Sequence, residues 1–212
     1  MSRGVLPADV PALRAYVGLG GNLGDRLATL RAGARALAHH LPRTQLVAAS
    51  PVYETRPIGP SSEPFLNAVA ELRTHLPPLE LLESMLDIER QHGRTRHGKW
   101  EARTLDLDLL LLLRPTADAW AQVETQSERL CVPHPRMLER DFVLVPLVDL
   151  LGPRAQVSGR ALGRWLERLG QEQRTILRRL DEGLIDAADG GLPDGEAVIG
   201  SRASAMRHRE GG

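Results

Sequence analysis

The chain has 212 residues, of which 42% are hydrophobic and 25% are charged, a composition typical of one globular domain. Its 27 basic and 27 acidic residues balance to a formal net charge of zero, which argues against attraction to nucleic acid or an anionic membrane through overall charge. A single cysteine, Cys131, excludes an intrachain disulfide, and no apolar run is long enough to span a bilayer, so we expect a cytoplasmic protein.

The hydrophobic pattern of the first half predicts alternating strands and helices. Apolar residues recur at helical spacing between Asp25 and Pro42, and again between the Pro77-Pro78 pair and Gly93. Strands are predicted at residues 14–19, 45–53, 65–74 and 104–113. The resulting order, β-α-β-β-α-β, is that of the split unit found in ferredoxin-like proteins, so we expect an α+β fold.

The second half predicts shorter elements. Residues 114–128 are interpreted as a polar excursion, 129–132 and 174–180 as short strands, and 141–150 and 160–169 as helices. The end of the chain is rich in Gly, Asp and Ser and buries too little apolar area to order itself. We therefore expect a flexible leader at residues 1–13, a single domain at 14–182 and a disordered tail at 183–212.

The sharpest chemical signal is the Asp106-Leu-Asp108 sequence in the last predicted strand of the core. Alternate strand residues share a face, so both carboxylates point one way while Leu105, Leu107 and Leu109 point into the core. Two solvent-facing acids on an edge strand are the simpler interpretation. The apolar run at 109–113, however, predicts a strand covered on both faces, where a divalent cation is needed to offset the paired charges. Magnesium together with substrate phosphates fits this donor pair.

A cationic loop precedes the two acids. Its charged side chains and one aromatic residue are Arg94, Arg96, His97, Lys99, Trp100 and Arg103. Such a run is often only solvated surface, but next to a carboxylate pair it is suited to bind a triphosphate, because arginine forks bind phosphate oxygens bidentately.

Other motifs are weaker when they are taken alone. The glycine-rich turn at residues 18–24 follows a strand and precedes a helix, yet it lacks the Lys-Ser/Thr ending of a phosphate-binding loop. His134 lies between two prolines and could contact phosphate or be structural. Phe65, Asn67 and Phe142 could form an aromatic slot with an amide, or they could be core residues.

Taken together and in order, these motifs resemble the 6-hydroxymethyl-7,8-dihydropterin pyrophosphokinase family of folate biosynthesis. The resembling segments are residues 16–25, 50–55, 57–59, 65–67, 88–89, 93–96, 103–108, 132–135 and 140–142. The chain departs from the family pattern at Arg56, where a second proline is usual, and at Glu101 and Ala102 in the cationic loop.

The resemblance implies a ferredoxin-like core enlarged to a three-layer α/β/α sandwich. Asp106 and Asp108 would hold two magnesium ions. The implied ATP site consists of Glu89, Arg94, Arg96, Trp100, Arg103, Leu109, Arg129, His134 and Arg140. The implied pterin site, with the ring between two phenylalanines, consists of Gly20, Asn22, Thr55, Ile58, Phe65, Asn67 and Phe142.

The expected reaction is attack of the pterin hydroxymethyl oxygen on the β-phosphorus of ATP, with Arg94 and Arg103 stabilising the transition state. Two alternatives remain at this point. One is a different magnesium-dependent phosphoryl or nucleotidyl transferase, and the other is a non-enzymatic ferredoxin-like module that binds RNA. We expect a monomer whose partners are ATP and a pterin alcohol, without nucleic acid or membrane.

Overall fold

The computed structural model describes residues 11–58, 63–93 and 104–185. In chain order the elements are β1 (Leu13–Gly21), α1 (Arg26–His39), β2 (Thr44–Ala49), β3 (Pro51–Thr55), β4 (Phe65–Thr74), α2 (Pro78–Gln91), β5 (Asp106–Pro115), β6 (Trp120–Gln122), β7 (Thr125–Gln126), β8 (Cys131–Val132), α3 (Asp141–Leu151), β9 (Gln156–Val157), β10 (Arg160–Ala161), α4 (Leu162–Glu167) and β11 (Ile176–Gly183). Single 3-10 turns lie at Met137–Glu139 and Gln171–Gln173. None of the helices within these ranges combines the length and hydrophobicity that a membrane span requires.

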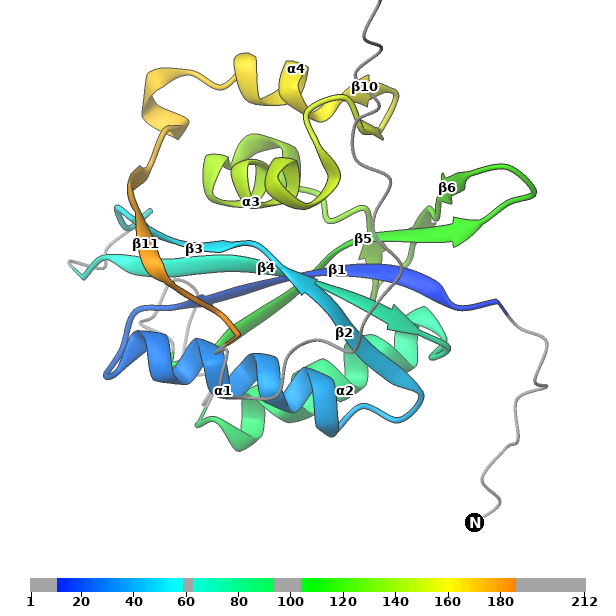
Figure 1. Ribbon diagram of the computed structural model, residues 1–212, viewed down its shortest axis with the longest axis horizontal. Coiled ribbons are helices and arrows are strands. Elements are labelled where there is room, and N and C mark those ends of the chain that lie inside the picture. The colour runs from blue at the N-terminus through cyan, green and yellow to red at the C-terminus, as the bar shows by residue number, and fades with distance from the viewer. Residues whose placement is uncertain (1–10, 59–62, 94–103, 186–212) are drawn as a thin grey trace, which may run out of the picture.

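Seven strands form one antiparallel sheet in the order β11-β3-β4-β1-β5-β6, and β2 also pairs with β4. The central strand β1 therefore lies between β4 and β5, as the β-α-β-β-α-β order requires. Helices α1 and α2 cover one face of the sheet, and α3 and α4 cover the other (Figure 1). The prediction of a ferredoxin-like core enlarged to a three-layer sandwich is confirmed.

Several predicted boundaries differ from the structure because tertiary pairing overrides local pattern. The predicted strand 45–53 is two strands, since Ser50 interrupts the ladder and its Oγ accepts a hydrogen bond from the Val69 amide at 2.9 Å. The predicted polar excursion 114–128 contains β6, which pairs with the end of β5. The predicted helix 160–169 starts only at Leu162, because the two preceding residues pair with β9. Residues 1–10 and 186–212 of the predicted leader and tail lie outside the described ranges.

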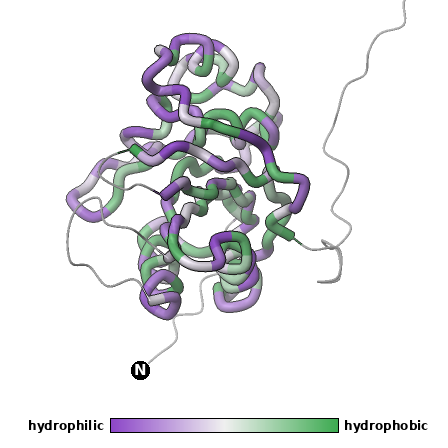
Figure 2. Tube along the Cα trace, turned by 90° about the vertical axis from the view of Figure 1, so that its left-hand side faces the viewer, coloured by the Kyte–Doolittle hydropathy of each residue, from purple (hydrophilic) through white to green (hydrophobic). Residues whose placement is uncertain are grey.

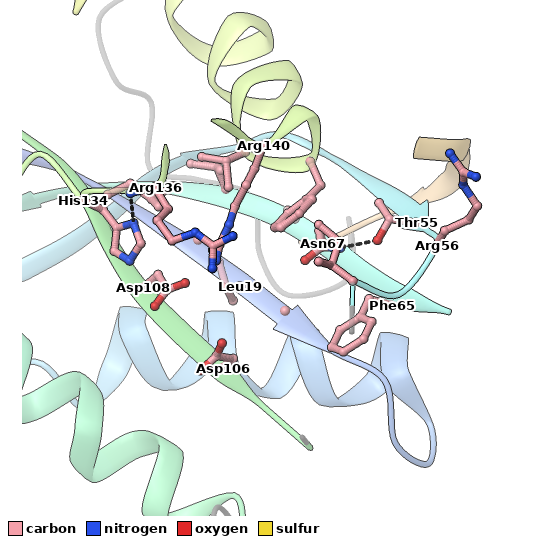
Figure 3. Close-up of a pocket in the computed structure, with 18 residues that line it drawn as sticks. Leu19, Thr55, Arg56, Phe65, Asn67, Asp106, Asp108, His134, Arg136 and Arg140 are labelled. Carbon is pink, nitrogen blue, oxygen red and sulfur yellow. Dashed lines mark hydrogen bonds between the residues drawn. The ribbon is translucent and has the colours of Figure 1, made fainter. Parts of the chain in front are cut away.

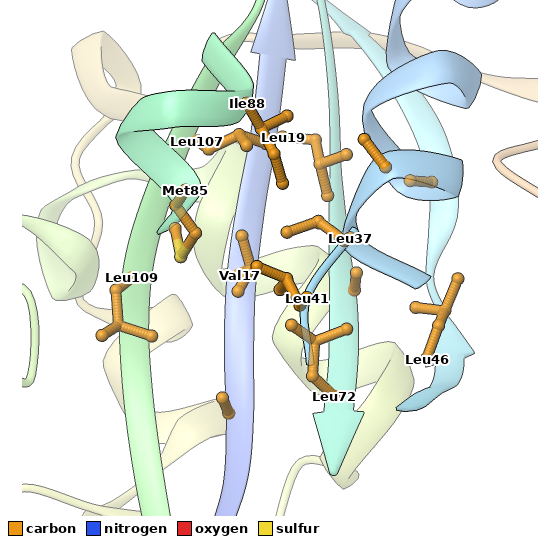
Figure 4. Packing of buried hydrophobic residues seen from close by; sticks show 14 of the residues in the cluster. Val17, Leu19, Leu37, Leu41, Leu46, Leu72, Met85, Ile88, Leu107 and Leu109 are labelled. Carbon is orange, nitrogen blue, oxygen red and sulfur yellow. The ribbon is translucent and has the colours of Figure 1, made fainter. Parts of the chain in front are cut away.

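Two hydrophobic clusters hold the three layers together. One lies between the sheet and the α1–α2 layer and includes Val17, Leu107 and Leu109 (Figure 4). The other lies on the α3 side and includes Leu110 and Leu111. A view at right angles shows hydrophobic residues on the sheet-facing sides of the lower helices and hydrophilic residues on their outer turns (Figure 2). Burying one leucine contributes about 1.5–3 kcal/mol, so these contacts fix the strands firmly.

The strand β5 is buried on both faces, as its leucine run predicts. Consecutive residues normally alternate faces, but the register between β1 and β5 shifts by one residue at Tyr16 and Val17. Leu110 and Leu111 therefore both join the cluster on the α3 side, while Leu109 and Leu112 join the other one. This bulge keeps the strand anchored on both sides immediately beyond the two aspartates.

The C-terminal strand β11 is tied to the sheet by an ionic cluster around Glu54 of β3. Its carboxylate accepts hydrogen bonds from Arg178 of β11 at 2.8 Å and from Arg26 of α1 at 2.9 Å. These bonds, led by the one from Arg178, lower the pKa of Glu54 below its ordinary value. The cluster joins three segments that are distant in the sequence.

A pH-dependent contribution to stability follows from this shift. Because the pKa of Glu54 is lower in the folded state, its contribution is complete above the unfolded-state pKa of about 4.3 and is lost as the pH falls through the folded-state pKa. We expect Glu54→Gln to lower the free energy of unfolding near neutral pH, and the difference from wild type to shrink below about pH 4. Denaturant titrations across that range measure it, and a difference that grows with acidity would contradict the assignment.

A close backbone approach explains Gly21, the last residue of β1. A Cβ atom there would lie 2.5 Å from the carbonyl oxygen of Thr104 and 3.3 Å from Leu30 Cδ1. Backbone atoms cannot move aside as the end of a side chain can, so only glycine allows the end of β1 to pack against the segment that precedes β5.

We expect Gly21→Ala to lower the free energy of unfolding by about 1–3 kcal/mol, as overpacking of a core typically does. Gly18→Ala on the same strand is the matched control, since its Cβ would meet Leu110 Cδ1 at an ordinary 3.4 Å. Urea titration of the two variants measures the difference. Equal stabilities would show that the Thr104 segment can move away.

Candidate active site

A cavity of about 350 Å³ opens on the α3 side of the sheet. Its walls come from β1, β3, β4 and β5, from the segment that precedes α3, and from the first residues of α3. Figure 3 shows the two aspartates on one side of this cavity and Thr55, Phe65 and Asn67 on the other. The cavity therefore brings together residues that are far apart in the sequence.

The acidic side consists of Asp106 and Asp108. Both line the cavity and are half-buried, while Leu107 between them is buried in the opposite cluster, so the predicted shared face is confirmed. Glycines stand opposite both of them on β1: Gly20 pairs with Asp106 and Gly18 with Asp108. Because glycine has no side chain, the space beside the carboxylates stays open. The predicted glycine-rich turn at residues 18–24 begins inside β1, and this role explains its strand glycines better than phosphate binding does.

The basic side consists of His134, Arg136 and Arg140. Figure 3 shows the side chains of both arginines directed toward the cavity, with His134 above Asp108. Burial lowers the pKa of Arg140, whose ordinary value lies so far above neutrality that the side chain stays charged. Its Nε is buried and has no hydrogen-bond partner within the described ranges, which suits it to bind an anion.

His134 is positioned as a neutral hydrogen-bond donor. Burial lowers its pKa, and the neighbouring Asp108 carboxylate acts in the opposite direction. Its Nδ1 accepts a hydrogen bond from the Arg136 amide at 3.2 Å, so in the neutral ring the proton is on Nε2. The backbone amide of His134 is bonded to the Leu110 carbonyl at 2.8 Å, which ties the residue to β5.

The opposite half of the cavity is an aromatic and amide pocket. Phe65 and Phe142 line it together with Ile58. Asn67 Nδ2 donates to Thr55 Oγ1 at 2.8 Å, and both residues are buried, so the amide is held in a fixed orientation. A flat ring can lie between such phenylalanines while the amide reads its edge.

Four predicted site residues lie away from the cavity lining. Glu89 is fully buried and accepts a hydrogen bond from the Leu107 amide at 2.7 Å, and Leu109 packs in the cluster beneath the sheet. Arg129 pairs with Glu83 of α2, and Asn22 is buried near the end of β1. Their predicted binding roles stay predictions. Arg94, Arg96, Trp100 and Arg103 fall outside the described residues.

The structure adds two charged lining residues that the motifs did not single out, Arg56 and Arg136. Arg136 lies between two of the segments that resemble the family, 132–135 and 140–142. This position in the sequence was the signal that could have identified it as a site residue. Arg56 is a position at which the chain departs from the family pattern. Such a departure shows that the residue differs from the family, but it does not indicate a function.

The donor set of the acidic side fits magnesium. No group of three or more His, Cys, Asp or Glu side chains suited to a metal occurs among the described residues. Two carboxylates that line an open cavity instead match a hard cation that takes its other ligands from substrate phosphates and water.

Gly20 provides a test of the cavity that is separate from folding. A Cβ at this position would lie 3.1 Å from Asn67 Oδ1, so Gly20→Ala forces the amide to shift and narrows the pocket. We expect a clear loss of affinity for a pterin ligand, measured by calorimetry, with a thermal midpoint much closer to wild type than that of Gly21→Ala. Unchanged affinity would show that this end of the cavity is not the ligand pocket.

Comparison with known families and curated relatives gives a consistent result. Residues 16–152 match the family described as 7,8-dihydro-6-hydroxymethylpterin-pyrophosphokinase (HPPK). The chain is 40% identical over 150 residues to 2-amino-4-hydroxy-6-hydroxymethyldihydropteridine pyrophosphokinase of Haemophilus influenzae, covering 68% of this chain and 88% of that protein. It is 46% identical over 137 residues to the protein of the same name from Bacillus subtilis, covering 64% and 77%.

A solved structure supports the fold. The protein described as HPPK-DHPS in complex with substrates superposes with a TM-score of 0.54 at 14% identity, covering 74% of this chain and 43% of that chain. At this low identity the likeness concerns the fold alone.

Proposed function

The chain belongs to the 7,8-dihydro-6-hydroxymethylpterin-pyrophosphokinase family, and we propose that the cavity above the sheet is its active site. The reaction transfers diphosphate from ATP to 6-hydroxymethyl-7,8-dihydropterin, giving AMP and the pterin diphosphate for folate biosynthesis. Family membership decides between this function and the two alternatives, a different transferase and an RNA-binding module. The observation that supports this proposal is that one cavity joins an acidic pair, two arginines and an aromatic pocket.

The pterin is assigned to the aromatic half of the cavity. Phe65 and Phe142 provide the stacking surfaces, and the fixed Asn67 amide offers hydrogen bonds to the edge of the ring. This placement directs the hydroxymethyl group toward the half of the cavity that contains the aspartates. Thr55 holds Asn67 in place, and Ile58 covers the outer edge of the pocket.

The triphosphate is assigned to the half between the acidic and basic sides. Asp106 and Asp108 would hold magnesium, and we propose two ions. When bound, magnesium neutralises phosphate charge and polarises the transferring group. His134 donates through Nε2–H, while Arg136 and Arg140 supply fixed positive charge for phosphate oxygens.

The chemical step needs little besides positioning and electrostatics. A bond forms between the hydroxymethyl oxygen and the β-phosphorus, the bond from that phosphorus to the α-phosphate oxygen breaks, and the hydroxyl proton is lost. Arg94 and Arg103 are proposed to stabilise the charge that develops. The remaining ATP-binding assignments, including Arg96 and Trp100, belong to the same proposal.

Other properties of the protein are proposed on chemical grounds. The zero net charge supports partners that are small molecules, with no nucleic acid and no membrane. A single cysteine suits a cytoplasmic location. We also propose that the protein acts as a monomer.

The test of function is a product assay. With ATP, magnesium and the pterin alcohol, the protein is expected to form AMP, and a chelator should stop the reaction. Asp106→Ala or Asp108→Ala should lower kcat by about 10²–10³ or more, because an electrostatic partner of the transition state is lost. Circular dichroism of both variants should match wild type.

Asp118→Ala is the matched control, since this carboxylate is exposed in the turn between β5 and β6 and should keep full activity. Formation of ADP in place of AMP would favour the alternative transferase. Wild-type turnover in either site variant would refute the metal assignment.

A further inference from the structure

We propose that Asp141 and Thr175 form a clamp that positions the two walls of the pterin pocket relative to each other. This inference rests on the proposed function of the cavity. It concerns a residue of the C-terminal segment, Thr175, which lies beyond the residues 16–152 that match the family. The clamp consists of hydrogen bonds between the start of α3, the segment before β11, and the end of β3.

The first half of the clamp is the carboxylate of Asp141, which is 3% exposed. Its Oδ2 accepts hydrogen bonds from the amides of Thr175 at 2.6 Å and Ile176 at 3.0 Å, and its Oδ1 accepts one from Thr175 Oγ1 at 2.6 Å. Charge-assisted bonds of this kind are short and strong, and burial strengthens them further. Both carboxylate oxygens are therefore engaged by one short segment of chain.

Asp141 stands between two residues of the cavity lining, Arg140 and Phe142. It is the first residue of α3, where a negative charge is also favourable to the helix dipole. Any displacement of its backbone moves the neighbouring guanidinium and aromatic ring together. Holding Asp141 thus fixes one wall of the pocket.

The second half of the clamp connects the same segment to the other wall. The carbonyl of Thr175 accepts a hydrogen bond from the Arg56 amide at 2.8 Å, and Arg56 Nη2 donates to the Arg174 carbonyl at 2.6 Å. Ile176 pairs with Thr55 in the sheet. Thr55 in turn receives the hydrogen bond from Asn67, so the amide that faces the ligand is linked to the clamp.

Thr175 therefore bonds to both walls at once. Its amide and hydroxyl donate to Asp141 in the wall that contains Phe142. Its carbonyl accepts from Arg56 in the wall that contains Thr55. Figure 1 shows β11 running from the α3–α4 layer to the edge of the sheet, which is the path such a link requires. Aromatic stacking depends steeply on the separation of the two walls, so their spacing should set the affinity for the flat ring.

A purely structural role would have different consequences. General loosening of α3 would affect all substrates and would follow from the loss of any comparable bond on that helix. A positioning role affects the pterin more than ATP, because the clamp joins both walls of the aromatic half, whereas Arg140 is only one of the phosphate-binding groups proposed above. The hydroxyl of Thr175 allows these cases to be separated, since its removal leaves the amide bonds to Asp141 in place.

The experiment compares Thr175→Val, Thr175→Ser, Asp141→Asn and a control in the product assay. Thr175→Val should raise the KM for the pterin about tenfold, the equivalent of one charge-assisted hydrogen bond, with the KM for ATP changed less than about twofold. Asp141→Asn should have at least the same effect, and Thr175→Ser, which keeps the hydroxyl, should return the pterin KM close to wild type. Calorimetry in the presence of a non-hydrolysable ATP analogue should rank the variants in the same order by their affinity for the pterin.

Tyr53→Phe is the matched control. It removes the bond from the Tyr53 hydroxyl to Asp149 Oδ2 at 2.7 Å, which also ties α3 to β3 but lies two turns along the helix, and Tyr53 does not line the cavity. Its thermal midpoint should fall about as much as that of Thr175→Val while its pterin KM stays near wild type.

The possible outcomes separate the two proposals. An unchanged pterin KM in Thr175→Val, failure of Thr175→Ser to restore it, or an equal rise in Tyr53→Phe would overturn the clamp while leaving the proposed function intact. A wild-type protein that forms no AMP from ATP and the pterin would instead overturn the function, and the clamp with it.

Discussion

The site depends on one strand that must hold two carboxylates next to each other while its leucines are buried. Leucines of β5 enter both hydrophobic clusters, and Asp106 and Asp108 occupy the positions where the strand faces the cavity. Like charges this close repel each other, so their separation would increase unless the backbone were held. The leucine contacts, together with the hydrogen bond that the Leu107 amide donates to Glu89, supply that restraint from beneath the sheet.

The cavity exists because neighbouring positions lack side chains. Gly18 and Gly20 stand opposite the two aspartates, so the central strand contributes only backbone to this part of the floor. On the other face the same strand carries Val17 and Leu19, which fill the core. Side chains of β1 thus alternate between large residues that pack below the sheet and glycines that leave space above it. A charged ligand and a flat ligand can bind next to each other in that space.

The sequence predicted the parts of the site that depend on local pattern. Alternation along the strand was enough to place Asp106 and Asp108 on one face, and the leucine run predicted burial on both sides. Contacts made by distant segments could not be predicted in this way. Nothing local indicates that Arg136 turns into the cavity, that Glu89 bonds to the Leu107 amide, or that Asp141 is engaged by Thr175. The prediction of one continuous strand at residues 45–53 was wrong, because the interruption at Ser50 depends on its hydrogen bond with Val69 of β4.

The link between Arg56 and the segment before β11 joins residues 118 positions apart, and the ionic contact between Glu54 and Arg178 spans 124. Contacts over such distances form late, since a long loop must close before they can contribute. During synthesis, the stretch that carries Thr175 leaves the ribosome after every other part of the pocket described here. Under the proposed clamp, a nascent chain can therefore have most of its sheet and core and still lack a defined ligand pocket until this stretch has emerged.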